Sequence, residues 1–126
     1  MKKNIILFII FVNFYSSVFA KHIHLEKEYQ KTFANRIGGK TEIVLEDGAR
    51  VDILTDEYAI EVDFANKWAE SIGQSLFYAL KTNKKPAVLL IIEKPTRDMK
   101  YLKRLKVVTE KYGIKVFVIT PDELCK

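Results

Sequence analysis

Two neighbouring segments each place a carboxylate between apolar residues. Asp52 is the central residue of the first segment, and Glu61 has the corresponding place in the second. If both segments are strands and Leu54 pairs with Ala59 across a four-residue loop, the antiparallel register sets Asp52 directly opposite Glu61, about 5 Å apart on one face. Like charges so placed repel each other, so we expect a positive group between them.

Two kinds of positive group could balance these carboxylates. A hard divalent cation, Mg²⁺ or Mn²⁺, suits carboxylate oxygens and water, and Asp63 would then be a further ligand on the same strand. The same register also places Arg50 opposite Asp63, so that Arg50 could neutralise the cluster as part of a salt-bridge network. The hairpin alone leaves the metal site and the salt-bridge network open as alternatives.

A polar stripe follows the acidic segment. Lys67, Gln74 and Tyr78 are spaced by seven and four residues, which places them within an arc of about 40° on a helix. In one interpretation Lys67 reaches back to the carboxylates while Gln74 and Tyr78 contact a substrate. In the other, the stripe is an ordinary solvated helix face.

The elements that must position these residues follow from hydrophobic periodicity and turn signals. An antiparallel meander followed by helical crossovers predicts an α/β fold of order α-β-β-β-α-β-α-β, a central mixed sheet flanked by helices. The expected helices cover residues 24–37, 66–81 and 96–112, with Asn66 as an N-cap, and the expected strands cover 41–46, 50–54, 58–64, 87–92 and 114–120.

The first twenty residues have the layout of a secretory signal peptide. Lys2 and Lys3 precede an apolar run over residues 5–12, and Val18-Phe19-Ala20 suits cleavage after Ala20. An uncleaved membrane anchor is the alternative, but the run is shorter than the roughly 20 residues that span a bilayer. We therefore expect a signal peptide over 1–20, a single domain over 21–126, no membrane span after cleavage, and a secreted or periplasmic protein.

Charge and cysteine content add little about partners. The net charge of +5 for the whole chain falls to about +3 without the two leader lysines, a mild bias that is compatible with a nucleic-acid partner. Cys125 is the single cysteine, so no internal disulfide forms. We expect the basic residues of the helix over 96–112 to form a solvated face, and His22 and His24 to belong to a frayed N-terminus.

The acidic segments and the polar stripe together resemble a known family. Glu28 on the first helix, Asp52, Glu61, and the stretch Gln74–Tyr78 resemble the motifs of the PD-(D/E)XK nuclease superfamily, in particular its branch with a Q-x-x-x-Y helix. The resemblance also covers the order of elements, over about residues 24–120, and implies a restriction-endonuclease-like fold.

The resemblance implies roles for individual residues. Asp52 and Glu61 would bind Mg²⁺ or Mn²⁺ with help from Glu28, and water on the metal would attack a phosphodiester bond. The family places a lysine two residues after the strand glutamate, and here that position is Asp63. Some members of the superfamily supply the lysine from the neighbouring helix, and Lys67 is placed to do so.

Two hypotheses for function remain from the sequence. The first is an exported, metal-dependent nuclease-like protein that hydrolyses nucleic acid, and the second is a catalytically inactive binding domain of the cell envelope with the same fold. In the second, Arg50 and Asp63 form a structural ion pair. The sequence does not distinguish DNA from RNA, internal from terminal cleavage, or one oligomeric state from another.

Overall fold

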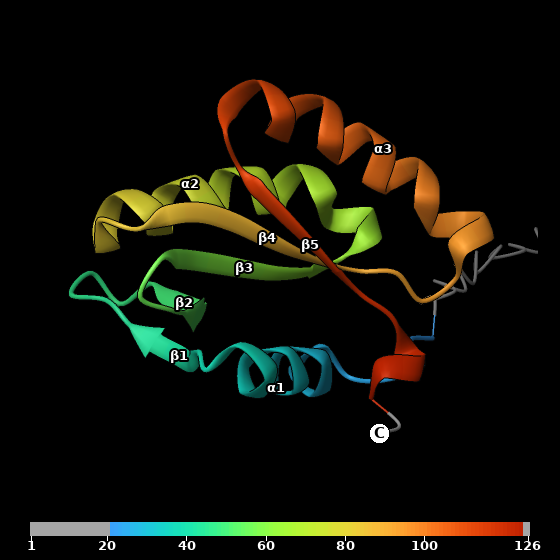
Figure 1. Cartoon of the computed structure of the whole chain (residues 1–126), viewed down its shortest axis with the longest axis horizontal. Helices are drawn as coiled ribbons and strands as arrows, with labels where there is room; N and C mark the ends of the chain where they lie inside the picture. The colour runs from blue at the N-terminus through green and yellow to red at the C-terminus, as the bar shows by residue number, and fades with distance from the viewer. Residues whose placement is uncertain (1–20, 125–126) are drawn as a thin grey trace, which may run out of the picture.

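The computed structural model describes residues 21–124. Within that range the order of elements is the one expected, and Figure 1 shows their arrangement. The elements are α1 (Glu26–Ile37), β1 (Lys40–Val44), β2 (Arg50–Leu54), β3 (Tyr58–Phe64), a short 3₁₀ helix η1 (Ala65–Lys67), α2 (Trp68–Thr82), β4 (Lys85–Ile91), α3 (Pro95–Tyr112), β5 (Lys115–Ile119) and a second 3₁₀ helix η2 (Pro121–Glu123).

The expected signal peptide lies outside the described residues, so the leader and the export that it implies stay predictions. Cys125 also lies outside them. None of the helices within residues 21–124 combines the length and the apolar content required to cross a bilayer.

The strands form one five-stranded mixed sheet in which they lie side by side in sequence order. The β1–β2 and β2–β3 pairs are antiparallel, whereas the β3–β4 and β4–β5 pairs are parallel. Because parallel neighbours need a crossover connection, α2 and α3 each return the chain across the sheet. Helices α2 and α3 cover one face and α1 covers the other (Figure 1), which confirms the expected mixed sheet flanked by helices.

Strand β4 is buried on both faces of the sheet. Leu89 and Ile91 pack with the α1 residues Tyr29 and Phe33, while Leu90 packs into a separate cluster with residues of α3. Side chains that alternate along a strand point to opposite faces, so a strand covered on both sides needs apolar residues throughout. The continuous apolar run over 87–92 is therefore explained by the two helical layers.

Local signals end the helices largely as expected, with one exception. Gly38 and Gly113 each adopt a φ of 69° after α1 and α3, a left-handed conformation that glycine permits at a helix C-terminus. The expectation that Asn66 is an N-cap is wrong. Asn66 lies inside η1, and α2 begins only at Trp68, with no side-chain hydrogen bond from the residue before it.

The segment that precedes α1 is anchored, so the expectation of a frayed N-terminus at His22 and His24 is wrong. His22 Nδ1 lies 3.0 Å from Glu93 Oε2, and the main-chain N–H groups of the next two residues donate to Glu93 Oε1 at 2.9 and 3.3 Å. The Tyr29 hydroxyl donates to the same oxygen at 2.8 Å. The His22 ring also stacks on Phe64 with ring centroids 3.5 Å apart. Glu93, just after β4, therefore fixes this segment to the sheet.

Candidate functional site

Asp52 lies where the regular pairing of β2 is interrupted. Between β1 and β2, Thr41 pairs with Ile53 and Ile43 pairs with Val51. Asp52, which lies between these two β2 residues, has no paired residue in β1. Glu42, which this register sets opposite Asp52, has a φ of 57°. A residue other than glycine rarely adopts this left-handed conformation, and such strained positions gather at functional sites.

The interruption also changes which face of the sheet the β2 side chains occupy. Val51 packs with Tyr78 of α2, whereas Ile53 packs in the cluster that contains Tyr29 of α1. Residues two apart in a regular strand share a face. The regular alternation of side chains along β2 is therefore broken at Asp52.

Specific hydrogen bonds hold Asp52 in this position. Its Oδ2 accepts the main-chain N–H of Val62 at 2.8 Å, and its main-chain oxygen accepts the Gln30 amide at 2.7 Å. The same Gln30 nitrogen donates to Glu42 Oε1 at 3.1 Å, and Gln30 is 3% exposed. Gln30 and Glu42 thus belong to the site although sequence reasoning missed both of them.

Glu61 and Asp63 complete a buried acidic cluster with Asp52. The predicted pairing of Leu54 with Ala59 is confirmed, and the side chains of Asp52 and Glu61 are hydrogen-bonded to each other. Glu61 is 5% and Asp63 6% exposed. Glu61 Oε2 and Asp63 Oδ2 are both buried without a hydrogen-bond partner within the described residues.

Burial and mutual repulsion make these carboxyl groups hard to ionise. Burial, then the charges of Asp52 and Asp63, raises the pKa of Glu61 to about 10. Burial, then the charge of Glu26, raises the pKa of Asp63 to about 7. Burial also raises the pKa of Asp52. At neutral pH without a cation, Glu61 therefore carries a proton and can share it with Asp52.

Lys67 and Glu26 lie at the edge of this cluster. Lys67 is exposed in η1, directly after β3. Burial raises the pKa of both Asp63 and Glu26, and the positive charge of Lys67 opposes this rise. Glu26, in the first turn of α1, has a pKa that burial and the charge of Asp52 raise. A lysine that precedes α2 thus lies near enough to the carboxylates for its charge to act on them.

The resemblance to the nuclease superfamily implies that Glu28 helps Asp52 and Glu61 to bind a metal, but the Glu28 side chain makes a different contact. Its Oε2 accepts the Leu25 main-chain N–H at 2.7 Å, and its side chain is 52% exposed. Such a bond satisfies a free donor at the start of the helix. The structure therefore assigns Glu28 to the N-terminal cap of α1, and the helix contributes Glu26 to the cluster instead.

Helix α2 brings Tyr78 to the carboxylates and leaves Gln74 exposed. Tyr78 is 8% exposed. Burial, and then the charges of Glu61 and Asp52, raises its pKa to about 12, while a hydrogen bond with Gln74 acts in the opposite direction. The polar stripe therefore faces the sheet at Tyr78 and solvent at Gln74, so it is not simply a solvated face.

The ion pair between Arg50 and Asp63 is not formed, although the charge of Arg50 opposes the rise that burial causes in the pKa of Asp52. Arg50 Nε lies 2.6 Å from Glu42 Oε2, so the guanidinium pairs with β1 and not with Asp63 as the second hypothesis required. The charge of Lys67 acts on Asp63 and opposes the rise in its pKa that burial and the charge of Glu26 cause. The buried oxygens of Glu61 and Asp63 are left without a cationic hydrogen-bond partner within residues 21–124.

The donor set fits a small divalent cation that keeps much of its water. Within residues 21–124 no group of three or more His, Cys, Asp or Glu side chains has the geometry of a metal cage. Mg²⁺ is usually held by one or two carboxylates together with water and substrate phosphates, not by such a cage. Asp52 and Glu61, with the free Asp63 oxygen nearby, offer carboxylates of this kind.

Comparisons with known proteins find similarity to viral proteins. The chain is 31% identical over 93 residues, 74% of its length, to the KilA-N domain-containing protein L33 of Acanthamoeba polyphaga mimivirus. It is 28% identical over 94 residues, 75% of its length, to the KilA-N domain-containing protein L32 of the same virus. It spans only 36% of L33 and 24% of L32. No family model and no solved structure matches the chain.

Proposed function

We propose that this chain is a metal-dependent, nuclease-like domain that hydrolyses phosphodiester bonds of nucleic acid. The α-β-β-β-α-β-α-β order and the mixed sheet support a restriction-endonuclease-like topology and membership of the PD-(D/E)XK superfamily. Fold alone does not define an activity. The proposal therefore depends on the acidic cluster.

The observation that carries the proposal is the pair of unsatisfied carboxylate oxygens, Glu61 Oε2 and Asp63 Oδ2. Buried polar atoms are nearly always hydrogen-bonded, so each exception calls for an explanation. Stacking acidic side chains beside them destabilises the fold further. A bound Mg²⁺ or Mn²⁺ ion would both satisfy the oxygens and offset the repulsion.

Each residue of the cluster then has a distinct role. Asp52 and Glu61 would hold the cation, which when bound supplies a Lewis acid for the phosphate and lowers the pKa of water. Asp63 would accept a hydrogen bond from water at the metal. Lys67 would donate to the attacking water or to a phosphate oxygen, and Gln74 and Tyr78 would contact the substrate.

One observation favours a second candidate, a domain of this fold that binds nucleic acid without cleaving it. Asp63 stands where the resemblance expects a lysine. An exposed lysine in η1 is less firmly positioned than one on a strand. If Lys67 cannot orient water, binding survives and hydrolysis is lost.

Cleavage assays on the purified chain test the proposal. Plasmid DNA, single-stranded DNA and RNA are incubated with Mg²⁺, Mn²⁺ or a chelator. We expect cleavage that needs the metal, disappears in Glu61→Gln, and survives in Glu110→Gln, which alters an exposed glutamate on α3. Cleavage that also disappears in Lys67→Ala assigns the lysine. Metal-independent cleavage, or full activity of Glu61→Gln, contradicts the proposal.

We also propose that the protein is exported, and this proposal does not depend on the nuclease activity. The signal peptide over 1–20 predicts that expression in a secreting host yields a mature chain that begins at Lys21. N-terminal sequencing of protein from the periplasm or medium checks this directly. Full-length protein retained in the cytoplasm would contradict export and leave the nuclease proposal unaffected.

A further inference from the structure

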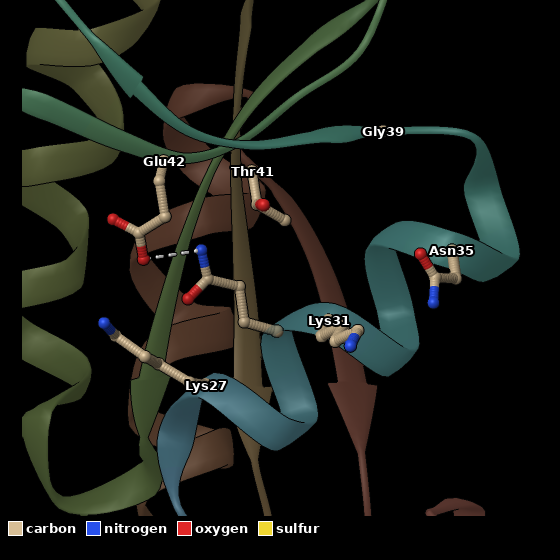
Figure 2. A pocket seen from close by; sticks show the side chains of 7 residues that line it. Lys27, Lys31, Asn35, Gly39, Thr41 and Glu42 are labelled. Carbon is tan, nitrogen blue, oxygen red and sulfur yellow. Dashed lines mark hydrogen bonds between the residues drawn. The ribbon is translucent and has the colours of Figure 1, made fainter.

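A pocket of about 300 Å³ lies between α1 and β1. Figure 2 shows Lys27 and Lys31 on α1 and Thr41 and Glu42 on β1, with the Lys27 side chain extended on the side of Glu42 and Lys31 further along the helix. Asn35, one turn further along α1, lines the end of the pocket. Residues at i, i+4 and i+8 share one side of a helix, so α1 presents a continuous polar stripe to this pocket.

The pocket carries a net positive charge. Lys27 and Lys31 are exposed and form no ion pair within residues 21–124. Glu42, the acidic residue of the lining, is already engaged by Arg50 at 2.6 Å and by the Gln30 amide at 3.1 Å. Two lysine charges therefore remain without a protein counter-ion.

The chemistry of the lining selects an anion with several oxygens. Two ammonium groups offer six N–H donors, and the Thr41 hydroxyl and the Asn35 amide add donors that carry no charge. Lysine binds phosphate as a point charge. Because Lys27, Lys31, Asn35 and Thr41 are all exposed, the pocket is open enough for one unit of a longer polyanion.

Gln30 joins this pocket directly to the acidic cluster. Its amide nitrogen donates both to Glu42 in the pocket wall and to the main-chain oxygen of Asp52. One buried side chain thus separates the two places. A strand whose reacting phosphate lay at Asp52 would therefore need to extend past Gln30 to place another phosphate in the pocket.

We infer that the α1–β1 pocket binds a backbone phosphate of a nucleic-acid strand, through Lys27 and Lys31, next to the phosphate at Asp52 and Glu61. The inference deepens the proposed function and rests on it for the identity of the polymer. The pocket positions the strand and does not take part in bond cleavage. Its phosphate contacts give affinity without reading the base sequence.

Binding assays on the purified chain test the pocket separately from catalysis. A fluorescein-labelled single-stranded oligonucleotide is titrated in chelator, so that no cleavage occurs, over a series of salt concentrations. The Lys27→Gln/Lys31→Gln variant should bind more weakly and make the slope of log K against log salt shallower by about 0.7, since the inferred site holds one phosphate and each single-strand phosphate contact contributes about 0.7. Each single variant should make it shallower by about half as much.

A matched control removes the same charge elsewhere. Lys103 and Lys106 are exposed on α3, across the sheet from α1, and Lys103→Gln/Lys106→Gln should leave the slope unchanged. Equal losses in both double variants would show a non-specific charge effect and overturn the inference. Melting temperatures of both double variants should match the wild type, because all four side chains are exposed.

Cleavage separates failure of the inference from failure of the proposed function. If the wild type cleaves and Lys27→Gln/Lys31→Gln keeps the same KM and salt slope, the pocket is not a phosphate site and the hydrolytic site stands. If the slope changes as expected but the wild type never cleaves, the phosphate site stands and hydrolysis is lost. A wild type that neither binds nor cleaves overturns both.

Discussion

Glu61 faces Asp52 inside a sheet, with Asp63 close by on the same strand. Burial and like charges hold the pKa of Glu61 at about 10 and that of Asp63 at about 7. The cluster therefore opposes folding whenever its carboxyl groups ionise without a cation. Protonation of Glu61 removes part of the repulsion, and under the proposed function a bound cation would remove the rest; the oxygens of Glu61 and Asp63 that lack a hydrogen-bond partner within the described residues are the groups it would satisfy.

The raised pKa values predict a stability that falls as pH rises. Consider a carboxyl group whose pKa is higher in the folded protein than in the unfolded chain. Its contribution to stability is fully present when the pH is below the pKa of the unfolded chain, and it is lost as the pH rises toward the pKa of the folded protein. In cation-free protein the melting temperature should fall from about pH 5 towards pH 9, through the pKa of Asp63 at about 7 and toward that of Glu61 at about 10. Glu61→Gln, which cannot ionise, should flatten this decline.

Glu93 and Asp98 do not mask this trend, because hydrogen bonds lower the pKa of each and their contributions are lost only in acid. Calorimetric melting across the pH series gives the measurement. A melting temperature that rises with pH in chelator would contradict the account of the cluster.

Divalent cations should reverse the loss at alkaline pH. A ligand that binds only the folded state stabilises it by about 2.7 kcal/mol at a concentration one hundred times its Kd. At that concentration Mn²⁺ should therefore raise the melting temperature of the wild type above pH 8 by about 10–20 °C, since each kcal/mol corresponds to about 4–8 °C for a domain of this size. Glu110→Gln should respond like the wild type, and Glu61→Gln should not respond.

At the scale of elements, the irregular points of the structure hold the site. The regular pairing of β2 is interrupted at Asp52, opposite the left-handed residue Glu42, and the segment before α1 is held by Glu93 after β4. Both arrangements place polar main-chain groups against buried carboxylates. Neither is a property of one helix or strand alone.

Glu93 should be important for stability although it lies outside the acidic cluster. It is 7% exposed and accepts hydrogen bonds from His22, Tyr29 and two main-chain N–H groups. Glu93→Ala leaves these donors without an acceptor, so we expect about 3 kcal/mol less unfolding free energy in urea. Glu110→Ala, on exposed helix surface, should change it by less than about 0.5 kcal/mol. Equal stability of both variants would show that the anchor contributes nothing.

The sequence predicts the regular elements because their causes are local. Alternation and loop length fix the Leu54–Ala59 register, and glycine ends α1 and α3. Gln30 and Glu93 were missed because their partners are far along the chain, 22 residues away for Asp52 and 71 for His22. Glu28 and Glu26 differ by half a helical turn, which motif spacing alone cannot resolve.

For the whole molecule, one strand joins the two halves of the core. Leu89 and Leu90 are both fully buried, on opposite faces of β4. The acidic cluster lies at the β2–β3 side of the same sheet, where α2 covers it with Tyr78 and α1 supplies Glu26 and Gln30. Both helical layers must therefore be docked before the site has its full set of residues.

Truncation inside this core should destabilise the protein without changing its chemistry. Leu90→Ala removes a fully buried side chain, so we expect a loss of about 3 kcal/mol in unfolding free energy. Leu80→Ala, at a position 85% exposed on α2, should cost far less. Urea denaturation measures both. A loss below about 1 kcal/mol for Leu90→Ala would contradict the two-layer core.

Titration calorimetry of Mn²⁺ binding to the metal-free chain tests the central claim most directly. Because the pKa of Glu61 is about 10, binding at neutral pH must displace its proton. The account predicts saturable binding whose heat depends on the ionisation enthalpy of the buffer, by an amount that corresponds to about one proton released. Glu61→Gln should abolish this release, and Glu110→Gln should keep it. Absence of binding, or equal binding by Glu61→Gln without proton release, would contradict a metal site at Asp52 and Glu61.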